Sequence, residues 1–161
     1  MPPSARPDAR PDPGLTVERW GPLVWALCHR LDPQPEDAWQ EVWEKVLRAL
    51  PAFDPAGPAA LSTWITRITH HHLVDRYRQR RRRGAPEDDD VDALPAPAAP
   101  ESPVDLEAAL ATLPEAWRRV IVLHHLHEVP LEAIAATEGV AVGTIKSRLH
   151  RARNRLSEIL R

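Results

Sequence analysis

The sequence has little of what disulfide-linked, membrane-spanning or sheet-rich proteins need. It holds a single cysteine, Cys28, which excludes an internal disulfide and fits a reducing compartment. No apolar run approaches the roughly 20 residues that a membrane-spanning helix requires, so we expect no membrane insertion. Glycine occurs only six times in 161 residues and β-branched runs are short, which gives little support for sheet. What remains is one medium domain or two small ones, built of helices.

Proline, by contrast, is abundant, and its distribution indicates how the chain is organised. Fifteen of the eighteen prolines cluster in 2–13, 33–35, 51–58 and 86–103. Clustered prolines mark tails and linkers and leave the intervals between them free to form helices. The first fourteen residues, 1–14, have no apolar core, so we expect a disordered tail rather than a secretory signal.

The formal net charge of −2 conceals an uneven distribution of charge. Residues 15–83 hold eleven basic and eight acidic residues, and residues 104–161 hold eight basic and seven acidic ones. Residues 84–103 hold six acidic residues and no basic one. Because this Pro/Ala-rich stretch cannot bury much apolar surface, we expect a flexible linker. The sequence thus predicts two weakly basic modules joined by an acidic tether.

Helical periodicity occurs three times in the first module. Apolar residues recur there at spacings of three and four, which is typical of one face of a helix. Each such face needs a partner to cover it, so we expect a small helical bundle. The third interval runs on into the basic block RYRQRRRR at 76–83. The three stripes are Trp20, Leu23, Val24, Leu27 and Leu31; Trp39, Val42, Trp43, Val46 and Leu50; and Leu61, Trp64, Ile65 and Ile68.

The second module also reads as helices, four in number. We expect the first two at 104–113 and 115–127. A third begins at Pro130 and ends at Gly139, because glycine often follows the last residue of a helix. A fourth runs from about Val142, and the pair that it forms with the third is a helix-turn-helix. The expected fold class is therefore all-α, with two small helical domains.

The last helix, in GVAVGTIKSRLHRARNRL, gathers basic residues without an acidic one. In a helix-turn-helix the second helix enters the DNA major groove, and Arg can bind a guanine edge through two hydrogen bonds. Backbone N–H groups at the helix start can hold a phosphate. A solvated basic helix without a partner is the alternative interpretation. The candidate DNA-binding residues are Gly143, Thr144, Lys146, Ser147, Arg148, His150, Arg151 and Arg153.

Three stretches together resemble the bacterial RNA polymerase sigma factors of the small, extracytoplasmic-function (ECF) group. They are EDAWQEVWEKVLRAL, FDP…STWITRITHHHLVDRYRQRRRR, and LATLPEAWRRVIVLHHLHEVPLEAIAATEGVAVGTIKSRLHRARNRL. The resemblance covers roughly 15–83 and 104–161, nearly everything except tail and linker. It implies a cytoplasmic, nucleoid-associated promoter-specificity subunit that is not an enzyme and takes no cofactor or small-molecule substrate. It also implies an anti-sigma factor as a partner.

The resemblance assigns the first module to sigma region 2, which docks on the polymerase β′ coiled coil and captures the melted −10 strand. The −10 preference is open, because the family usually has Arg and Asn at positions 70 and 71. Trp43 is equally well explained as a core residue, and Trp64 fits the core better than a stacking role. The polymerase-binding residues so implied are Asp37, Gln40, Glu41 and Trp43. The −10 candidates are Arg67, His70, His71, Arg76 and Arg80.

The second module is assigned to sigma region 4, which reads the −35 element and rests on the β flap. By the family pattern, Ser147, His150 and Arg151 face bases, while Lys146, Arg148 and Arg153 hold phosphates. Ala141 stands where a capping residue is common. His124 and His127, three residues apart, are the pair best spaced for chelation, but we predict no metal site.

Two other classes of protein are alternatives. A stand-alone helix-turn-helix regulator would bind specific duplex DNA without polymerase. An adaptor would bind only polymerase or an anti-sigma protein. The sequence shows no phosphate loop, no paired catalytic carboxylates and no nucleophile–base arrangement, so we expect no enzyme. The acids of the linker prompt one more hypothesis, that they screen the basic modules in the free chain.

Overall fold

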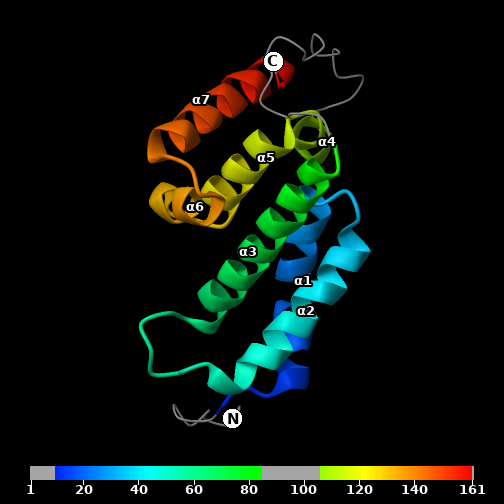
Figure 1. Cartoon of the computed structure of the whole chain (residues 1–161), viewed down its shortest axis with the longest axis vertical. Coiled ribbons are helices and arrows are strands. Elements are labelled where there is room, and N and C mark those ends of the chain that lie inside the picture. The colour runs from blue at the N-terminus through cyan, green and yellow to red at the C-terminus, as the bar shows by residue number, and fades with distance from the viewer. Residues whose placement is uncertain (1–9, 85–105, 161) are drawn as a thin grey trace. The chain divides into compact units, whose positions relative to one another are not determined.

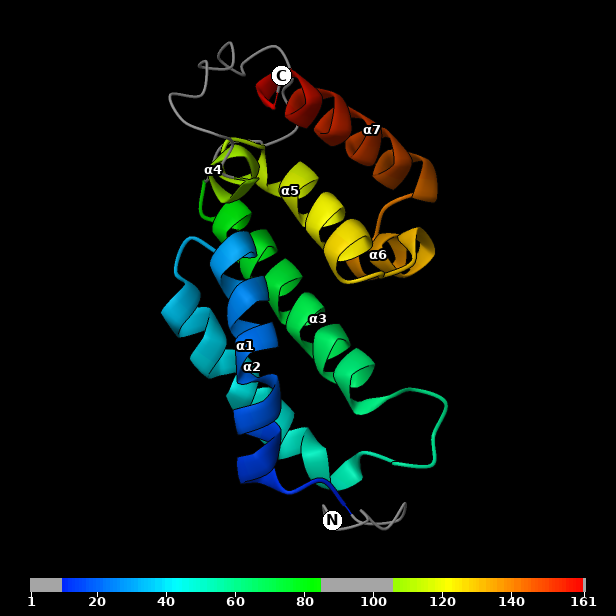
Figure 2. The ribbon, with the colours of Figure 1, turned by 180° about the vertical axis from the view of Figure 1, so that it is seen from behind.

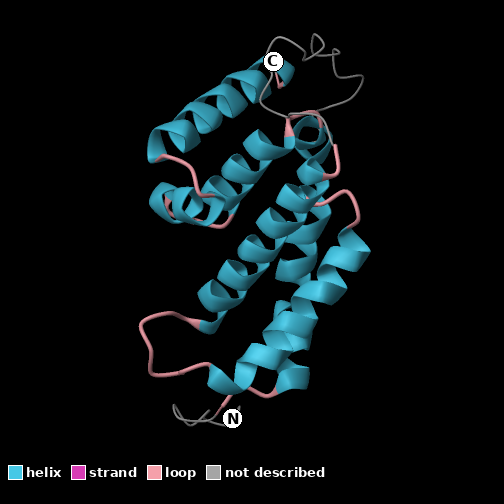
Figure 3. Cartoon of the chain, in the orientation of Figure 1, coloured by secondary structure: helices cyan, strands magenta, loops and turns pink. Residues whose placement is uncertain are grey.

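The computed structural model describes residues 10–84 and 106–160, and within them every regular element is a helix (Figure 1, Figure 3). The all-α prediction is confirmed. The chain divides into two compact units, Met1–Asp75 and Arg76–Arg161, with one helix, α3, crossing the boundary. The acidic residues of the linker lie outside the described residues, as does most of the predicted tail. Among the helices described, none is both long and apolar enough to cross a membrane.

The first unit begins with helices α1 (Pro13–Leu31) and α2 (Pro35–Ala49), which lie side by side in opposite views (Figure 1, Figure 2). α1 starts inside the stretch predicted as tail because Asp12 caps it, accepting a hydrogen bond of 2.9 Å from the Leu15 N–H. A proline at the first position suits both helices, since that N–H has no partner within a helix.

A short 3₁₀ helix, η1 (Leu50–Ala52), and a loop lead from α2 to α3 (Leu61–Arg82). The predicted apolar stripes form the core of this unit. The fully buried aliphatic side chains come from all three long helices and are Val24, Leu27, Val42, Val46, Ile65 and Leu73.

The second unit contains α4 (Leu106–Ala111), α5 (Glu115–Ile121), a π-helical turn η3 (Val122–Leu126), α6 (Leu131–Glu138) and α7 (Val142–Ile159). α7 packs against α4, α5 and α6. The helix predicted over 115–127 therefore changes from α to π form at Val122. Buried side chains from α5, η3, α6 and α7 form the core, led by Trp117, Val120, Leu123, Ile134 and Ile145.

The turn between α6 and α7 has the geometry that the sequence predicts. Gly139 ends α6 in the left-handed region at φ 67°, and its N–H donates to the Ala135 carbonyl. Ala141 precedes α7 with extended backbone and makes no side-chain cap. The helix-turn-helix is thus present, and α7 is its second helix.

Candidate nucleic-acid interface

The second helix of the helix-turn-helix separates cleanly into a buried face and a free face. Ile145, Leu149, Ala152 and Leu156 are buried against the other helices of the unit. This leaves the polar side chains of α7 pointing to solvent, where a DNA groove can reach them. The predicted residues that the structure places on this exposed surface are Gly143, Thr144, Lys146, Ser147, His150, Arg151 and Arg153.

Asn154 adds a polar group to this surface that the sequence interpretation missed. Its side-chain nitrogen lies 3.1 Å from His150 Nε2, one helical turn away. If the amide donates this hydrogen bond, a neutral His150 carries its proton on Nδ1. The spacing of four residues was the available signal, because such residues are neighbours on a helix surface. Asn154 therefore orients the ring of the candidate base reader His150.

Among the predicted residues of α7, Arg148 is the exception, because its side chain is turned inward and is only 11% exposed. It forms a 2.8 Å ion pair with Glu138 at the end of α6, and Glu138 also pairs with Arg119 of α5 at 2.7 Å. The sequence interpretation missed Glu138 and Arg119. The signal was that Glu138 continues the apolar stripe of Leu131, Ile134 and Ala135, where a carboxylate needs a buried partner.

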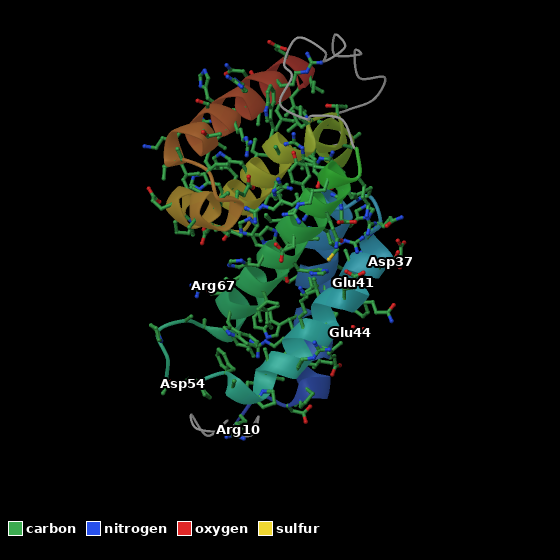
Figure 4. The ribbon with its side chains drawn as sticks, in the orientation of Figure 1. Arg10, Asp37, Glu41, Glu44, Asp54 and Arg67 are labelled. Carbon is green, nitrogen blue, oxygen red and sulfur yellow. The ribbon has the colours of Figure 1, made fainter. Side chains whose placement is uncertain are left out.

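The candidates for the −10 strand divide between exposed and covered positions. Arg67 and His71 are exposed, and Figure 4 shows Arg67 on the side of α3 turned away from α2. His70 is only 3% exposed. Arg76 is partly buried, and Arg80 is ion-paired with Glu115 inside the second unit. Arg67 and His71 are thus the most accessible of the five.

The other histidine and aromatic side chains near this face serve packing. His72 is buried, and its Nε2 lies 2.8 Å from Glu41 Oε2, which joins α3 to α2. Trp64 packs on Phe53 with ring centroids 5.2 Å apart. Both rings are partly buried, so Trp64 packs against its neighbour while part of its surface stays exposed.

α2 presents an acidic outer face, along which Figure 4 shows Asp37, Glu41 and Glu44 in succession. Asp37 and Gln40 are exposed, whereas Glu41 is held in part by His72. Trp43 is 4% exposed, so of its two interpretations the structure supports the core residue.

An apolar groove lies beside this acidic face, between α1 and α2. It has a volume of about 560 Å³ and is lined by Gly21, Pro22, Trp25, Glu36, Trp39 and Gln40. Trp25 is 40% exposed there, and Trp39 rests edge-on against buried Trp43. The aromatic side chains available to a partner on this surface are therefore Trp25 and Trp39.

The second unit has an apolar pocket of about 370 Å³ between α4, η3 and α7. His125 lines it, and burial, followed by the charges of His124 and Arg153, lowers the pKa of His125 below its ordinary value of 6.5. His124 Nδ1 lies 3.1 Å from the Val129 carbonyl oxygen. Over residues 10–84 and 106–160, no three His, Cys, Asp or Glu side chains gather as metal ligands would.

The fold and this surface define a class of protein in which a helix-turn-helix unit with a basic recognition helix follows another helical unit in the chain. The comparisons with family models are consistent with that class. Residues 16–83 match Sigma-70 region 2, and residues 104–156 match Sigma-70 region 4. The chain belongs to the ECF sigma factors of RNA polymerase, a family of DNA-binding proteins that are not enzymes.

Individual relatives agree with this assignment. The chain is 32% identical over 155 residues to the ECF RNA polymerase sigma factor SigE of Mycolicibacterium smegmatis, a match that takes in 89% of this chain and 60% of SigE. It therefore spans about three fifths of that relative's length. It is 34% identical over 148 residues to EcfG of Rhodopseudomonas palustris, covering 86% of this chain and 80% of EcfG.

Solved structures show the same architecture. The sigma factor RpoE of Bartonella quintana, in complex with the anti-sigma factor NepR, superposes with a TM-score of 0.62 at 28% identity, over 91% of this chain and 95% of RpoE. CnrH, in complex with the cytosolic domain of CnrY, has a TM-score of 0.52 at 24% identity, over 92% of this chain and 86% of CnrH, and shows the fold alone.

Proposed function

We propose that this chain joins core RNA polymerase in the cytoplasm and directs it to promoters by reading the −35 duplex with α7 and holding the melted −10 strand with α3. The observation that carries the proposal is the exposed polar face of α7. Ser147, His150 and Arg151 share this face, while the apolar face opposite is buried. A recognition helix needs both, since one face fixes it to the domain and the other meets base edges.

The exposed groups on α7 suit two kinds of contact. Arg151 is assigned to a base edge, with Ser147 and His150 beside it. Lys146 and Arg153, together with the N–H groups at the start of the helix, are assigned to phosphates, which fix the register of the protein on the duplex. On α3, Arg67 and His71 are assigned to the single strand, because a cation and a stacking ring are what such a strand binds.

The outer face of α2 is assigned to the β′ coiled coil of core polymerase. Its acidic residues Asp37 and Glu44 suit a basic partner, and the neighbouring groove supplies aromatic side chains. Buried aromatic residues commonly contribute most of the binding energy of an interface. We therefore assign the anchoring role to Trp25 and Trp39 in place of Trp43.

Two further partners are part of the proposal. The apolar pocket between α4, η3 and α7 is assigned to the β flap of polymerase. An anti-sigma factor is expected as well, because RpoE was solved in complex with one.

Run-off transcription with purified core polymerase on a genomic promoter library tests the proposed function. We expect promoter-dependent transcripts that require the chain. Arg151→Ala should cost about 1–3 kcal/mol at one base position of the −35 element, which appears as relaxed selectivity there. Arg10→Ala, an exposed arginine far from α7 in sequence, is the matched control and should change nothing.

The absence of any promoter-dependent product would sink the proposal. Sequence-specific binding to duplex DNA by the chain alone would favour the stand-alone regulator. Transcription that Arg151→Ala leaves untouched would favour the adaptor.

The polymerase contact has its own test. Trp25→Ala should weaken binding to core polymerase by about tenfold or more, since truncated aromatic anchors commonly cost 2 kcal/mol or above. Binding of promoter DNA by the isolated chain should stay as it was. The control is Leu15→Ala, another exposed apolar residue, which lies in the first turn of α1 and outside the groove. Equal losses for the two variants would contradict an anchor at Trp25.

A further inference from the structure

Three charged side chains meet inside the second unit, one from each of three helices. Arg119 of α5 donates from Nε to Glu138 Oε1 at 2.7 Å, and Arg148 of α7 donates from Nη1 to Glu138 Oε2 at 2.8 Å. The side chains are 1%, 4% and 11% exposed in the order Arg119, Glu138, Arg148. One carboxylate thus uses a different oxygen for each of two other helices.

Such burial of charge is costly unless each group has a partner of opposite charge, and here each has one. Arg119 also reaches Glu115 Oε1 at 3.4 Å, and Glu115 pairs with Arg80 as well, so that three arginines share two carboxylates. Charge-assisted hydrogen bonds are short and directional, and they hold their partners in one geometry. Apolar contacts such as those of Ile145 and Leu149 are not directional, and they allow a helix to slide or rotate slightly.

The cluster lies where it can hold the recognition helix in a fixed orientation. Glu138 is the last residue of α6 and directly precedes the turn at Gly139. Arg148 lies on α7 between the candidate base readers, with Ser147 just before it and Arg151 one turn after it. The Glu138–Arg148 pair therefore clamps the recognition helix to the helix that precedes it, at the level of the base readers.

We propose that Arg148 is a positioning residue and not a phosphate contact, and that Glu138 and Arg119 hold it so that α7 presents Ser147, His150 and Arg151 at a fixed angle. The inference rests on the proposed function of α7 as the −35 reader. A phosphate contact needs its charge at the surface, as Lys146 has it. The Arg148 guanidinium is instead bonded inward to Glu138.

Salt dependence separates the two roles. A side chain that neutralises a phosphate contributes about 0.9 to the slope of log affinity against log salt, whereas a side chain that orients others contributes nothing to it. The experiment uses the complete chain with core polymerase. It measures affinity over a salt series for a preferred promoter and for one with an altered −35 element. The variants are Glu138→Gln, Arg148→Gln, the double variant, and Lys146→Gln as the matched surface control.

We expect Lys146→Gln to lower the slope by about 0.9 and to weaken both promoters alike. Arg148→Gln and Glu138→Gln should keep the wild-type slope and reduce the preference for the correct −35 element by about tenfold or more, which corresponds to the loss of one base contact. The double variant should do no worse than either single one, because both members of the pair are then removed together. Glu138→Gln is nearly the same shape as the native residue, and it carries the test if Arg148→Gln does not fold.

Two results would overturn the inference: a slope lowered by Arg148→Gln as much as by Lys146→Gln, or a −35 preference that Glu138→Gln leaves intact. The wild-type arm tests the underlying function. If the wild-type complex has no −35 preference, the proposed function fails and the inference fails with it. If the wild type is selective and Glu138→Gln is equally selective, only the inference fails.

Discussion

Glu128 occupies a backbone conformation that suits glycine. It lies in the loop after the π-helical turn with φ 53°, and its side chain is exposed. A residue with a Cβ costs roughly 1–2 kcal/mol in this left-handed region. Glycine removes this strain but also raises the entropy of the unfolded chain, which opposes folding. With both effects counted, Glu128→Gly should raise the free energy of unfolding of the second unit by about 1 kcal/mol. Hydrogen exchange of amides in α5 and α7 under mild denaturant measures this change in the free energy of unfolding.

The control for this variant is Glu132→Gly, four residues further on in the first turn of α6. There the same substitution replaces a residue with helical dihedral angles, and it should lower stability by up to about 1 kcal/mol. If glycine lowers the free energy of unfolding at both positions, the backbone of Glu128 is not strained.

His125 gives the second unit a pH dependence of defined sign. Its pKa is lowered in the folded chain, first by burial and then by His124 and Arg153, so the folded state favours the neutral ring. The stabilisation is complete above the ordinary pKa of 6.5 and is lost as pH falls from there through the lowered value. Between about pH 7.5 and 5.5, wild type should lose more thermal stability than His125→Gln. If the thermal stability of the two proteins changes with pH in the same way, the pH dependence does not come from His125.

Individual residues also show where sequence reasoning reached its limit. The exposed positions of α7 were predictable because an apolar stripe defines the opposite face. The burial of His70 was not, because it depends on which other helix covers that side of α3. Trp43 lies on a predicted apolar stripe, so its burial was one of the two interpretations that the sequence allowed. Arg148 looked like its basic neighbours in sequence, and only the position of Glu138 at the end of α6 reveals its different environment.

Among the elements, α7 begins without a side-chain cap. Ala141 has the extended backbone of a cap residue, φ −66° and ψ 147°, yet its side chain offers no oxygen to the N–H groups of the first turn. Its carbonyl oxygen accepts from the Thr144 N–H at 3.0 Å. Ala141→Ser should stabilise the second unit by about 1 kcal/mol, because the hydroxyl can accept from the N–H of Gly143 or Thr144. Hydrogen exchange at the start of α7 measures the local gain.

Ala136→Ser, at an exposed position within α6, is the matched control. Serine there has no cap to make and has a lower helix propensity than alanine, so that variant should lose a few tenths of a kcal/mol. If both serines lower stability, the N–H groups at the start of α7 are satisfied in another way.

The positions of the helices were predictable, whereas one of their forms was not. Spacing of apolar residues and the breaks at proline and glycine located α1, α2, α3, α6 and α7. The continuation of α5 as a π-helical turn was missed. There the Val129 N–H bonds back to the Leu123 carbonyl, which depends on the loop that follows and leaves no mark on hydrophobic periodicity.

For the whole molecule, the distribution of charge has a testable effect. Neutralising five of the six linker acids takes the formal net charge from −2 to +3. Random DNA should then bind more tightly at low salt, because the acids no longer offset the attraction of the basic helices. The variant replaces Glu87, Asp88, Asp89, Asp90 and Asp92 with their amides.

The control makes the same charge change at five exposed acids outside the linker. If the linker acids act by lying close to basic residues, the linker variant should bind random DNA more tightly than this control in fluorescence titrations. Equal affinities would show that only the net charge counts. The control positions are Glu18, Glu36, Glu44, Glu128 and Glu132.

The division of α7 into a buried face and an exposed face bears on how such proteins diversify. Substitutions at exposed positions usually change stability by less than about 0.5 kcal/mol. Ser147, His150 and Arg151 can therefore be exchanged while Ile145 and Leu149 keep the helix in place. A duplicated copy of this chain could acquire a new set of target genes through a few such exchanges, without first losing its fold.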